Sequence, residues 1–173
     1  GVNDETGFIL RMLGVSSVVS GSYLVNHKSI GAALMHLRSS VIHSNYQVSD
    51  FMMDTQNAPI IAADSGVRDI FQSIEHSNLG FTILQHEDKT LFGISSNADM
   101  RRGLLKHLDD FNKVSVEDIV NTHPVTIEET ATISELLHLI QSKRFLISYL
   151  PVINNQQELT GALSFINLIR SES

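Results

Sequence analysis

Two stretches of the chain, 67–77 and 133–141, carry apolar residues at the three- and four-residue intervals of an amphipathic helix. In the first stretch these residues are Val67, Ile70, Phe71 and Ile74. In the second they are Ile133, Leu136, Leu137 and Ile140. The pattern predicts one helix in each half of the chain.

Each predicted helix is followed by two apolar stretches that a polar turn separates, which is typical of a β-hairpin. The predicted strands are residues 80–84, 90–94, 145–153 and 158–163. A short helix is expected before each of these units, at 48–53 and 116–120, and a proline then leads into an extended segment. With a closing helix, each half has the order αβαββα, which predicts an α+β fold.

The two halves are one repeated unit, because separate landmarks are displaced by the same number of positions. Asp50 near the start of the first unit corresponds to Asp118 in the second, 68 positions later. The closing segment that begins at Gly93 corresponds to the one that begins at Gly161, again 68 positions later. A duplicated unit of this kind sets the architecture of the whole chain.

The repeat divides the chain into three parts. Residues 47–112 are assigned to the first repeat and 113–173 to the second, while residues 1–46 are expected to form a helical extension or the end of a preceding domain. Apolar spacing predicts helices near 8–13 and 30–37 in this extension. Since the first residue is not Met, we expect the chain to be a segment of a longer protein.

Each repeat ends in the pattern Gly-hydrophobic-x-Ser/Thr-x-x-Asp/Asn, and this duplicated motif resembles that of tandem CBS domains, or Bateman modules. The resemblance covers about residues 47–170. It implies a pseudo-twofold pair whose sheets face each other, with two clefts that take adenine nucleotides or related molecules. Residues 78–84 and 93–105 are similar to the CBS tail of the arabinose-5-phosphate isomerase family. In that family a separate sugar-isomerase domain performs the catalysis, so no catalytic residue is assigned to this chain.

Ser96 and Asp99 are predicted to hold a ribose phosphate in the first repeat. Ser96 is expected at a strand-to-helix turn, where free backbone N–H groups favour an anion, and the Asp99 carboxylate can accept bonds from both ribose hydroxyls. Arg101 or Arg102 could reach the phosphate. The alternative interpretation is a capping box at the helix start, with both arginines on an exposed face.

The second repeat has Ser164 and Asn167 at the equivalent positions. Because Asn167 carries no charge, we expect a weaker or altered site, or else a simple helix cap. The predicted ligand set is completed by backbone groups near the two prolines, which could meet a flat base or could merely start a strand: Pro59, Ile60, Pro124 and Val125.

Composition excludes several other classes of function. The net charge of −7 disfavours a nucleic-acid partner, and the apolar runs are too short for membrane insertion. Cysteine is absent, which leaves the cytoplasm as the expected location, and the histidines are scattered without the spacing of a metal site. No nucleophile elbow or phosphate-binding glycine loop predicts catalysis.

We therefore expect a regulatory module rather than an enzyme. It would require no cofactor, would bind AMP, ADP, ATP or a nucleotide-sugar between its repeats, and would control an attached domain or a partner. Two alternatives stay open, namely the regulatory tail of a sugar-phosphate isomerase and a structural dimerisation module without a ligand. A homodimer is expected in either case, with the short helices 48–53 and 116–120 offering apolar surface.

Overall fold

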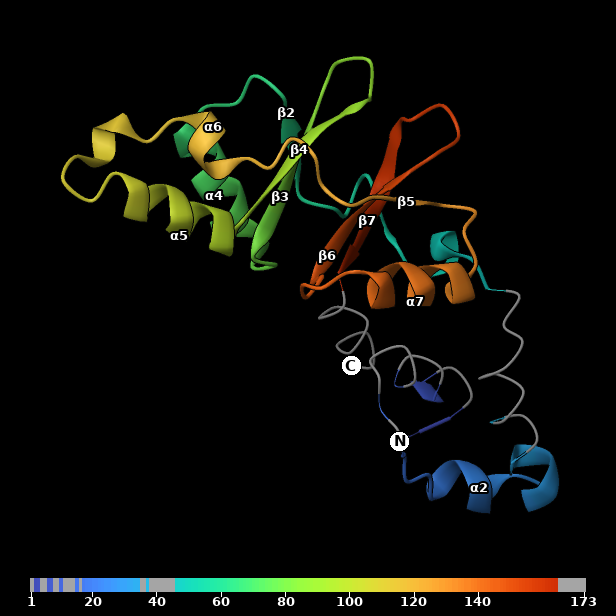
Figure 1. Ribbon diagram of the computed structural model, residues 1–173. Helices are drawn as coiled ribbons and strands as arrows, with labels where there is room; N and C mark the ends of the chain where they lie inside the picture. Colours follow the sequence, from blue (N-terminus) through green and yellow to red (C-terminus); the bar gives the residue numbers. More distant parts are fainter. Residues whose placement is uncertain are drawn as a thin grey trace.

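The computed structural model describes residues 2–3, 6–7, 10, 15, 17–34, 37 and 46–164. Residues 46–164 form two sheets that lie side by side, with helices on their outer sides (Figure 1). This arrangement confirms the predicted α+β fold.

The smaller sheet has the order β2-β3-β4, and the larger has the order β1-β7-β6-β5. The strands of the smaller sheet are β2 (Ile60–Ala62), β3 (Phe81–Gln85) and β4 (Leu91–Ser96). Those of the larger sheet are β1 (Met53–Asp54), β5 (Ile127–Glu128), β6 (Tyr149–Ile153) and β7 (Leu159–Ser164). The helices described over their whole length are α2 (Ser22–Asn26), α4 (Val67–Ser77), α5 (Asn97–Lys106), α6 (Val116–Ile119) and α7 (Ile133–Ser142), with short 3₁₀ turns η1 (Val48–Asp50) and η2 (Phe111–Lys113).

Strand register confirms the repeat at its spacing of 68 positions. Phe81 lies opposite Ser96 in the first hairpin, and Tyr149 lies opposite Ser164 in the second. Both hairpins also shift register at the same point, between Leu84 and Gln85 and between Val152 and Ile153. The two halves therefore share the irregularity of the hairpin as well as its strands.

The leading segment of each repeat crosses over and packs on the other repeat. Strand β1 pairs with β7, so that Met53 faces Ala162, and Val48 is fully buried in the core of the second repeat. Conversely, Asn121 pairs with Ile94 of β4 through two backbone hydrogen bonds of 3.0 and 2.8 Å. Each repeat therefore completes the sheet of the other.

Two glycines make these crossings possible. A Cβ atom at Gly93 would lie 2.8 Å from both the carbonyl oxygen of Asn121 and a methyl group of Val120, and one at Gly161 would collide with the carbonyl oxygen of Met53. Backbone that passes so close leaves no room for a side chain. The glycine that opens each closing motif is thus required by the crossing segment.

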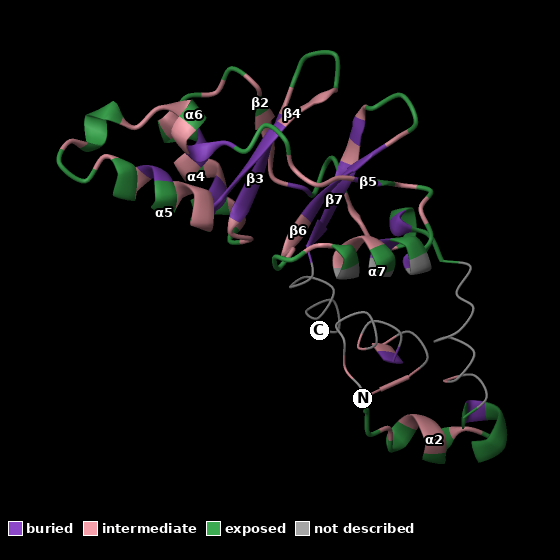
Figure 2. Cartoon of the chain, viewed as in Figure 1, coloured by how far each residue is buried: buried purple, intermediate pink, exposed green. Residues whose placement is uncertain are grey.

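Side chains of β3 alternate between two buried faces. Phe81 and Ile83 pack toward the second repeat, in a cluster that includes Leu159, whereas Leu84 packs with Ile70 of α4. Because both faces are covered, the central strands are buried nearly throughout (Figure 2).

Some predictions of element boundaries need correction. Helix α4 has the predicted bounds, but residues 145–148 are not part of a strand, and β6 begins at Tyr149. Phe145 and Leu146 are exposed, so their apolar character does not reflect a place in the sheet. The short helix expected at 48–53 is reduced to η1, since Met53 already belongs to β1.

The predicted extension is described only in part. Residues 30–34 are helical, with Ala33 buried but Ile30 and Leu34 exposed. The helix expected near residues 8–13 lies almost wholly outside the described residues.

Candidate functional site

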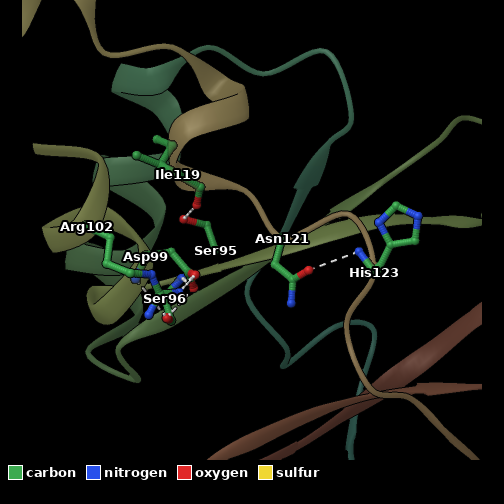
Figure 3. A network of polar contacts seen from close by, with 7 residues as sticks. All are labelled: Ser95, Ser96, Asp99, Arg102, Ile119, Asn121 and His123. Atoms are coloured by element: carbon green, nitrogen blue, oxygen red, sulfur yellow. Dashed lines mark hydrogen bonds and ion pairs between the residues drawn. The ribbon is translucent and has the colours of Figure 1, made fainter. Parts of the chain in front are cut away.

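Ser96 and Asp99 meet at the start of α5, where β4 turns into the helix. The Ser96 amide donates a hydrogen bond of 3.0 Å to Asp99 Oδ2, and the Asp99 amide donates one of 3.3 Å to Ser96 Oγ. The Ser96 hydroxyl also donates to Asp99 Oδ2. These bonds make the capping box that was one of the two interpretations of the motif, and they fix the carboxylate at the strand-to-helix turn (Figure 3).

The second oxygen of Asp99 has a partner of a different kind. Arg102 donates to Oδ1 from a side chain that is 67% exposed, whereas the Asp99 side chain is only 14% exposed. Arg101 is exposed and has no ion pair with any described residue. The structure therefore brings Ser96, Asp99 and Arg102 together and leaves Arg101 apart.

Pro59 and Ile60 lie on the other side of β3 from Ser96. The Pro59 carbonyl accepts a hydrogen bond of 2.8 Å from the Ile83 amide, so it points toward β3. Backbone groups of successive residues in a strand point in opposite directions, and those of Ile60 therefore point to the open edge of the sheet. Pro59 therefore immediately precedes β2, and the Ile60 backbone groups face the edge of the sheet that no described strand covers.

A cavity of about 1050 Å³ lies along this part of the molecule. It is lined by residues 60–64, which include β2, and by residues 85–90, which include the tip of the first hairpin. Of the predicted ligand residues of the first repeat, only Ile60 lines it, since Ser96 and Asp99 lie at the opposite end of the hairpin. The predicted ligand residues of the first repeat thus lie at two opposite edges of the smaller sheet, Ile60 at the open edge of β2 and Asp99 at the start of α5.

The second repeat does not reproduce this arrangement in full. Pro59 precedes Ile61 by two residues, whereas Pro124 precedes its ladder equivalent, Ile127, by three. Val125 is half-buried against the core of the second repeat and lies before β5 begins. The proline alignment on which Pro124 and Val125 were chosen is therefore displaced by one residue.

Ser164 ends β7, and its side chain is buried. Its hydroxyl has no hydrogen-bond partner among the residues that the structure describes. The predicted partner position, Asn167, lies outside the described residues. Ligand binding by the predicted residues of both repeats stays a prediction.

An aromatic pair connects the two repeats beside the predicted site. Phe81 and Tyr149 occupy equivalent positions and stack with ring centroids 4.6 Å apart and an interplanar angle of 25°. Burial, together with the negative charge of Asp99, raises the pKa of the Tyr149 hydroxyl. The prediction overlooked this pair, although two aromatic residues 68 positions apart were a visible signal.

Among the described residues, no cluster of three His, Asp or Glu side chains could hold a metal ion. No helix in the described part of the chain is long and apolar enough to span a bilayer. In the two short helices expected to support dimerisation, Val48 and Ile119 are fully buried within the chain, whereas Phe51, Met52 and Val116 are half-buried.

Solved structures with the same arrangement include several CBS pairs. The CBS-pair protein CBSX2 from Arabidopsis thaliana superimposes with a TM-score of 0.60 at 21% identity, over 74% of this chain and 94% of that one. The CBS domain pair of protein MJ0100 gives a TM-score of 0.61 at 16% identity, over 74% and 96%. Residues 116–173 also match the CBS domain family.

This chain folds as a CBS domain pair. The CBS pair also matches curated relatives, among them the arabinose 5-phosphate isomerase KdsD of Pseudomonas aeruginosa, at 23% identity over 125 residues. The same enzyme of Escherichia coli K12 is 24% identical over 125 residues. In both matches the alignment covers 72% of this chain but 37% of the relative, so the chain spans little more than a third of these proteins.

CBS pairs among the structural neighbours have been solved with adenosine compounds. CBSX2 has been solved in complex with AMP, and this structure superimposes with a TM-score of 0.58 at 22% identity, over 73% of this chain and 95% of that one. The MJ0100 pair was solved with 5-methylthioadenosine and S-adenosyl-L-methionine.

Proposed function

We propose that this CBS pair is a regulatory module that binds an adenosine nucleotide in its first repeat. The observation that carries the proposal is the position of the Asp99 carboxylate, held at the start of α5 by Ser96 in a fold whose relatives bind adenosine compounds. The ribose would meet Asp99, and the base would lie between the repeats, on the side of β4 where Asn121 pairs with Ile94.

Binding requires one exchange of partners at Asp99. The Ser96 bonds keep Oδ2 in place, and a ribose hydroxyl would replace Arg102 at Oδ1. Arg102 is largely exposed, so its side chain would be free to turn toward the phosphate. The ligand would thereby break the ion pair between Asp99 and Arg102 and would contact both residues itself.

The regulatory effect would follow from the contacts between repeats. A nucleotide at Asp99 lies near the Phe81–Tyr149 stack, which joins the two sheets. A ligand shifts an equilibrium between two conformations only if it binds one of them more tightly than the other. The Phe81–Tyr149 stack is a contact between the repeats that could differ between two such conformations. This conformational change would be transmitted to another domain of the same polypeptide or to a partner protein.

Calorimetric titration with AMP, ADP and ATP tests the proposal, with Asp99→Asn as the variant. Loss of a charged hydrogen bond should weaken AMP binding by roughly tenfold or more. The matched control is Asp69→Asn, because the Gly66 amide donates to Asp69 Oδ2 at the start of α4 in the same way, with a bond of 3.0 Å. Equal binding by both variants would leave Asp99 with a capping role only, and no heat for any nucleotide with the wild-type chain would overturn the proposal.

The match to arabinose 5-phosphate isomerases favours a second, compatible candidate. In this candidate the nucleotide-binding pair regulates a sugar-phosphate isomerase domain encoded in the same reading frame. A full-length gene product whose arabinose 5-phosphate isomerisation changes on adding AMP, and no longer does so in Asp99→Ala, would support it. A reading frame without such a domain would rule it out.

A further inference from the structure

The side chain of Tyr149 reaches from the second repeat to the start of α5 in the first. Its ring stacks on Phe81, with centroids 4.6 Å apart, in the apolar cluster between the repeats. A Cβ atom at Gly80, the residue before β3, would lie 3.6 Å from the Tyr149 hydroxyl oxygen and 3.1 Å from Nδ2 of Asn97, the first residue of α5. The hydroxyl therefore lies beside the turn that carries Asp99.

The Tyr149 hydroxyl makes no hydrogen bond to any residue in the described part of the chain. Burial, together with the nearby charge of Asp99, raises its pKa, so the hydroxyl is neutral at pH 7. A neutral phenolic hydroxyl can donate one hydrogen bond and accept others. The structure thus places an unused donor close to the Asp99 carboxylate.

A ribose bound at Asp99 needs such a donor. A carboxylate can only accept hydrogen bonds, so Asp99 would bind a ribose hydroxyl through the hydrogen atom of that hydroxyl. The hydroxyl oxygen still carries its lone pairs, and once it has left water it requires a donor of its own. Arg102 is assigned to the phosphate. A sugar hydroxyl placed between Asp99 and Tyr149 would be paired in both directions.

The equivalent place in the second repeat lacks this donor. Tyr149 and Phe81 occupy equivalent positions in the two hairpins, so the ring that corresponds to Tyr149 at the second site is Phe81, which has no hydroxyl. The position equivalent to Asp99 is Asn167, which has no charge. Packing of the two rings does not require the Tyr149 hydroxyl, because Phe81 packs without one. The carboxylate and the phenol therefore occur together only at the first site.

We propose that the Tyr149 hydroxyl binds a ribose hydroxyl together with Asp99, so that the first site selects ribonucleotides over deoxyribonucleotides. The inference rests on the proposed nucleotide site and names the part of the ligand that this site recognises. Because Tyr149 belongs to the second repeat and Asp99 to the first, one sugar hydroxyl would connect the two halves. The ribose would be held most tightly in the conformation that brings both side chains together.

Calorimetric titration with AMP, 2′-deoxy-AMP and 3′-deoxy-AMP compares the wild-type chain with Tyr149→Phe. This substitution removes the hydroxyl but keeps the ring that stacks on Phe81. Tyr46→Phe is the matched control, because Tyr46 also belongs to an aromatic pair, with its ring centroid 5.3 Å from that of Phe51. Asn97→Ser removes the other side-chain donor beside the Tyr149 hydroxyl.

The wild type should bind AMP roughly tenfold more tightly than at least one of the two deoxy compounds. Tyr149→Phe should weaken AMP binding by roughly tenfold, on the scale of one lost hydrogen bond. It should change the affinity for that deoxy compound by less than about twofold, because the hydroxyl that the tyrosine would bind is already missing. A general loss of packing would instead weaken all three ligands in the same proportion. Tyr46→Phe and Asn97→Ser should keep the wild-type preference.

Two kinds of failure are separable. If the wild-type chain binds none of the three nucleotides, the proposed function is wrong, and the role of Tyr149 is wrong with it. If the wild type binds AMP without discriminating against either deoxy compound, or if Tyr149→Phe keeps the wild-type preference, the ribose contact alone is overturned. Loss of the preference in Asn97→Ser but not in Tyr149→Phe would also overturn it, because the donor would then be the Asn97 amide.

Discussion

Replacing Gly93 by alanine tests the crossing of the two repeats directly. The added Cβ would lie 2.8 Å from the Asn121 carbonyl oxygen and 2.8 Å from a methyl group of Val120. Ordinary van der Waals contact begins at 3.4 Å, so the crossing segment would have to move by several tenths of an ångström. That segment is held to Ile94 by two hydrogen bonds, which must stretch if it moves.

Overpacking of this kind typically costs about 1–3 kcal/mol. For a chain of this length each kcal/mol corresponds to about 2–4 °C in the melting temperature, and we therefore expect Gly93→Ala to melt about 2–12 °C below the wild type. Gly161→Ala should be at least as destabilising, since the carbonyl oxygen of Met53 approaches that position even more closely.

Thermal unfolding followed by circular dichroism measures both variants. Gly21→Ala is the control, because a Cβ there would meet no atom within 4 Å, and its melting temperature should stay close to that of the wild type. If Gly93→Ala and Gly161→Ala also melt at the wild-type temperature, the segments do not cross the sheets as described.

Three further predictions concern single side chains. Ile119→Ala should lower the free energy of unfolding by about 2–5 kcal/mol in urea titrations, because its fully buried side chain fills the core of the first repeat, while Ile30→Ala at an exposed position should change it little. The pKa of Asp118 is held well below its usual value, mainly by a hydrogen bond from Lys106. The ionised Asp118 carboxylate therefore stabilises the folded chain above about pH 4, and this stabilisation is lost as the pH falls below that value. Asp118→Asn should therefore unfold at lower urea than the wild type at pH 7, with a difference that narrows at pH 3. Ultraviolet titration should show one tyrosine that ionises later than free tyrosine, and Tyr149→Phe should remove that late step; a curve unchanged by the substitution would contradict the burial of its hydroxyl.

The sequence predicted those features that depend on neighbours along the chain. Apolar spacing located α4, and the constant displacement between the repeats placed Ser96 and Asp99 at a strand-to-helix turn. A capping box and a ribose contact use the same residue types at the same spacing, and for this reason the sequence left both interpretations open.

Features that depend on contacts between the repeats were not predicted. Val48 has the same local pattern whether it packs on its own repeat or on the other, so periodicity could not reveal the crossing. Phe145 and Leu146 continue an apolar run without belonging to the sheet, because hydrophobic character alone does not separate strand from exposed loop. The hydrogen bonds that join Thr82 to Ser73 and to the Pro59 carbonyl were missed, because these three residues lie far apart in the sequence pattern and meet only in the fold.

The exchange of leading segments limits the motions that this molecule can use to transmit a signal. Opening the two halves like a hinge would break the pairing of Met53 with Ala162 and that of Asn121 with Ile94 at once. Small sliding of one sheet along the other can keep both pairings, because packed layers tolerate shear better than separation. A conformational change in this molecule would therefore consist of small displacements distributed over both repeats. The displacements would be smallest where the crossing segments pair with the sheets, at Met53 and Asn121.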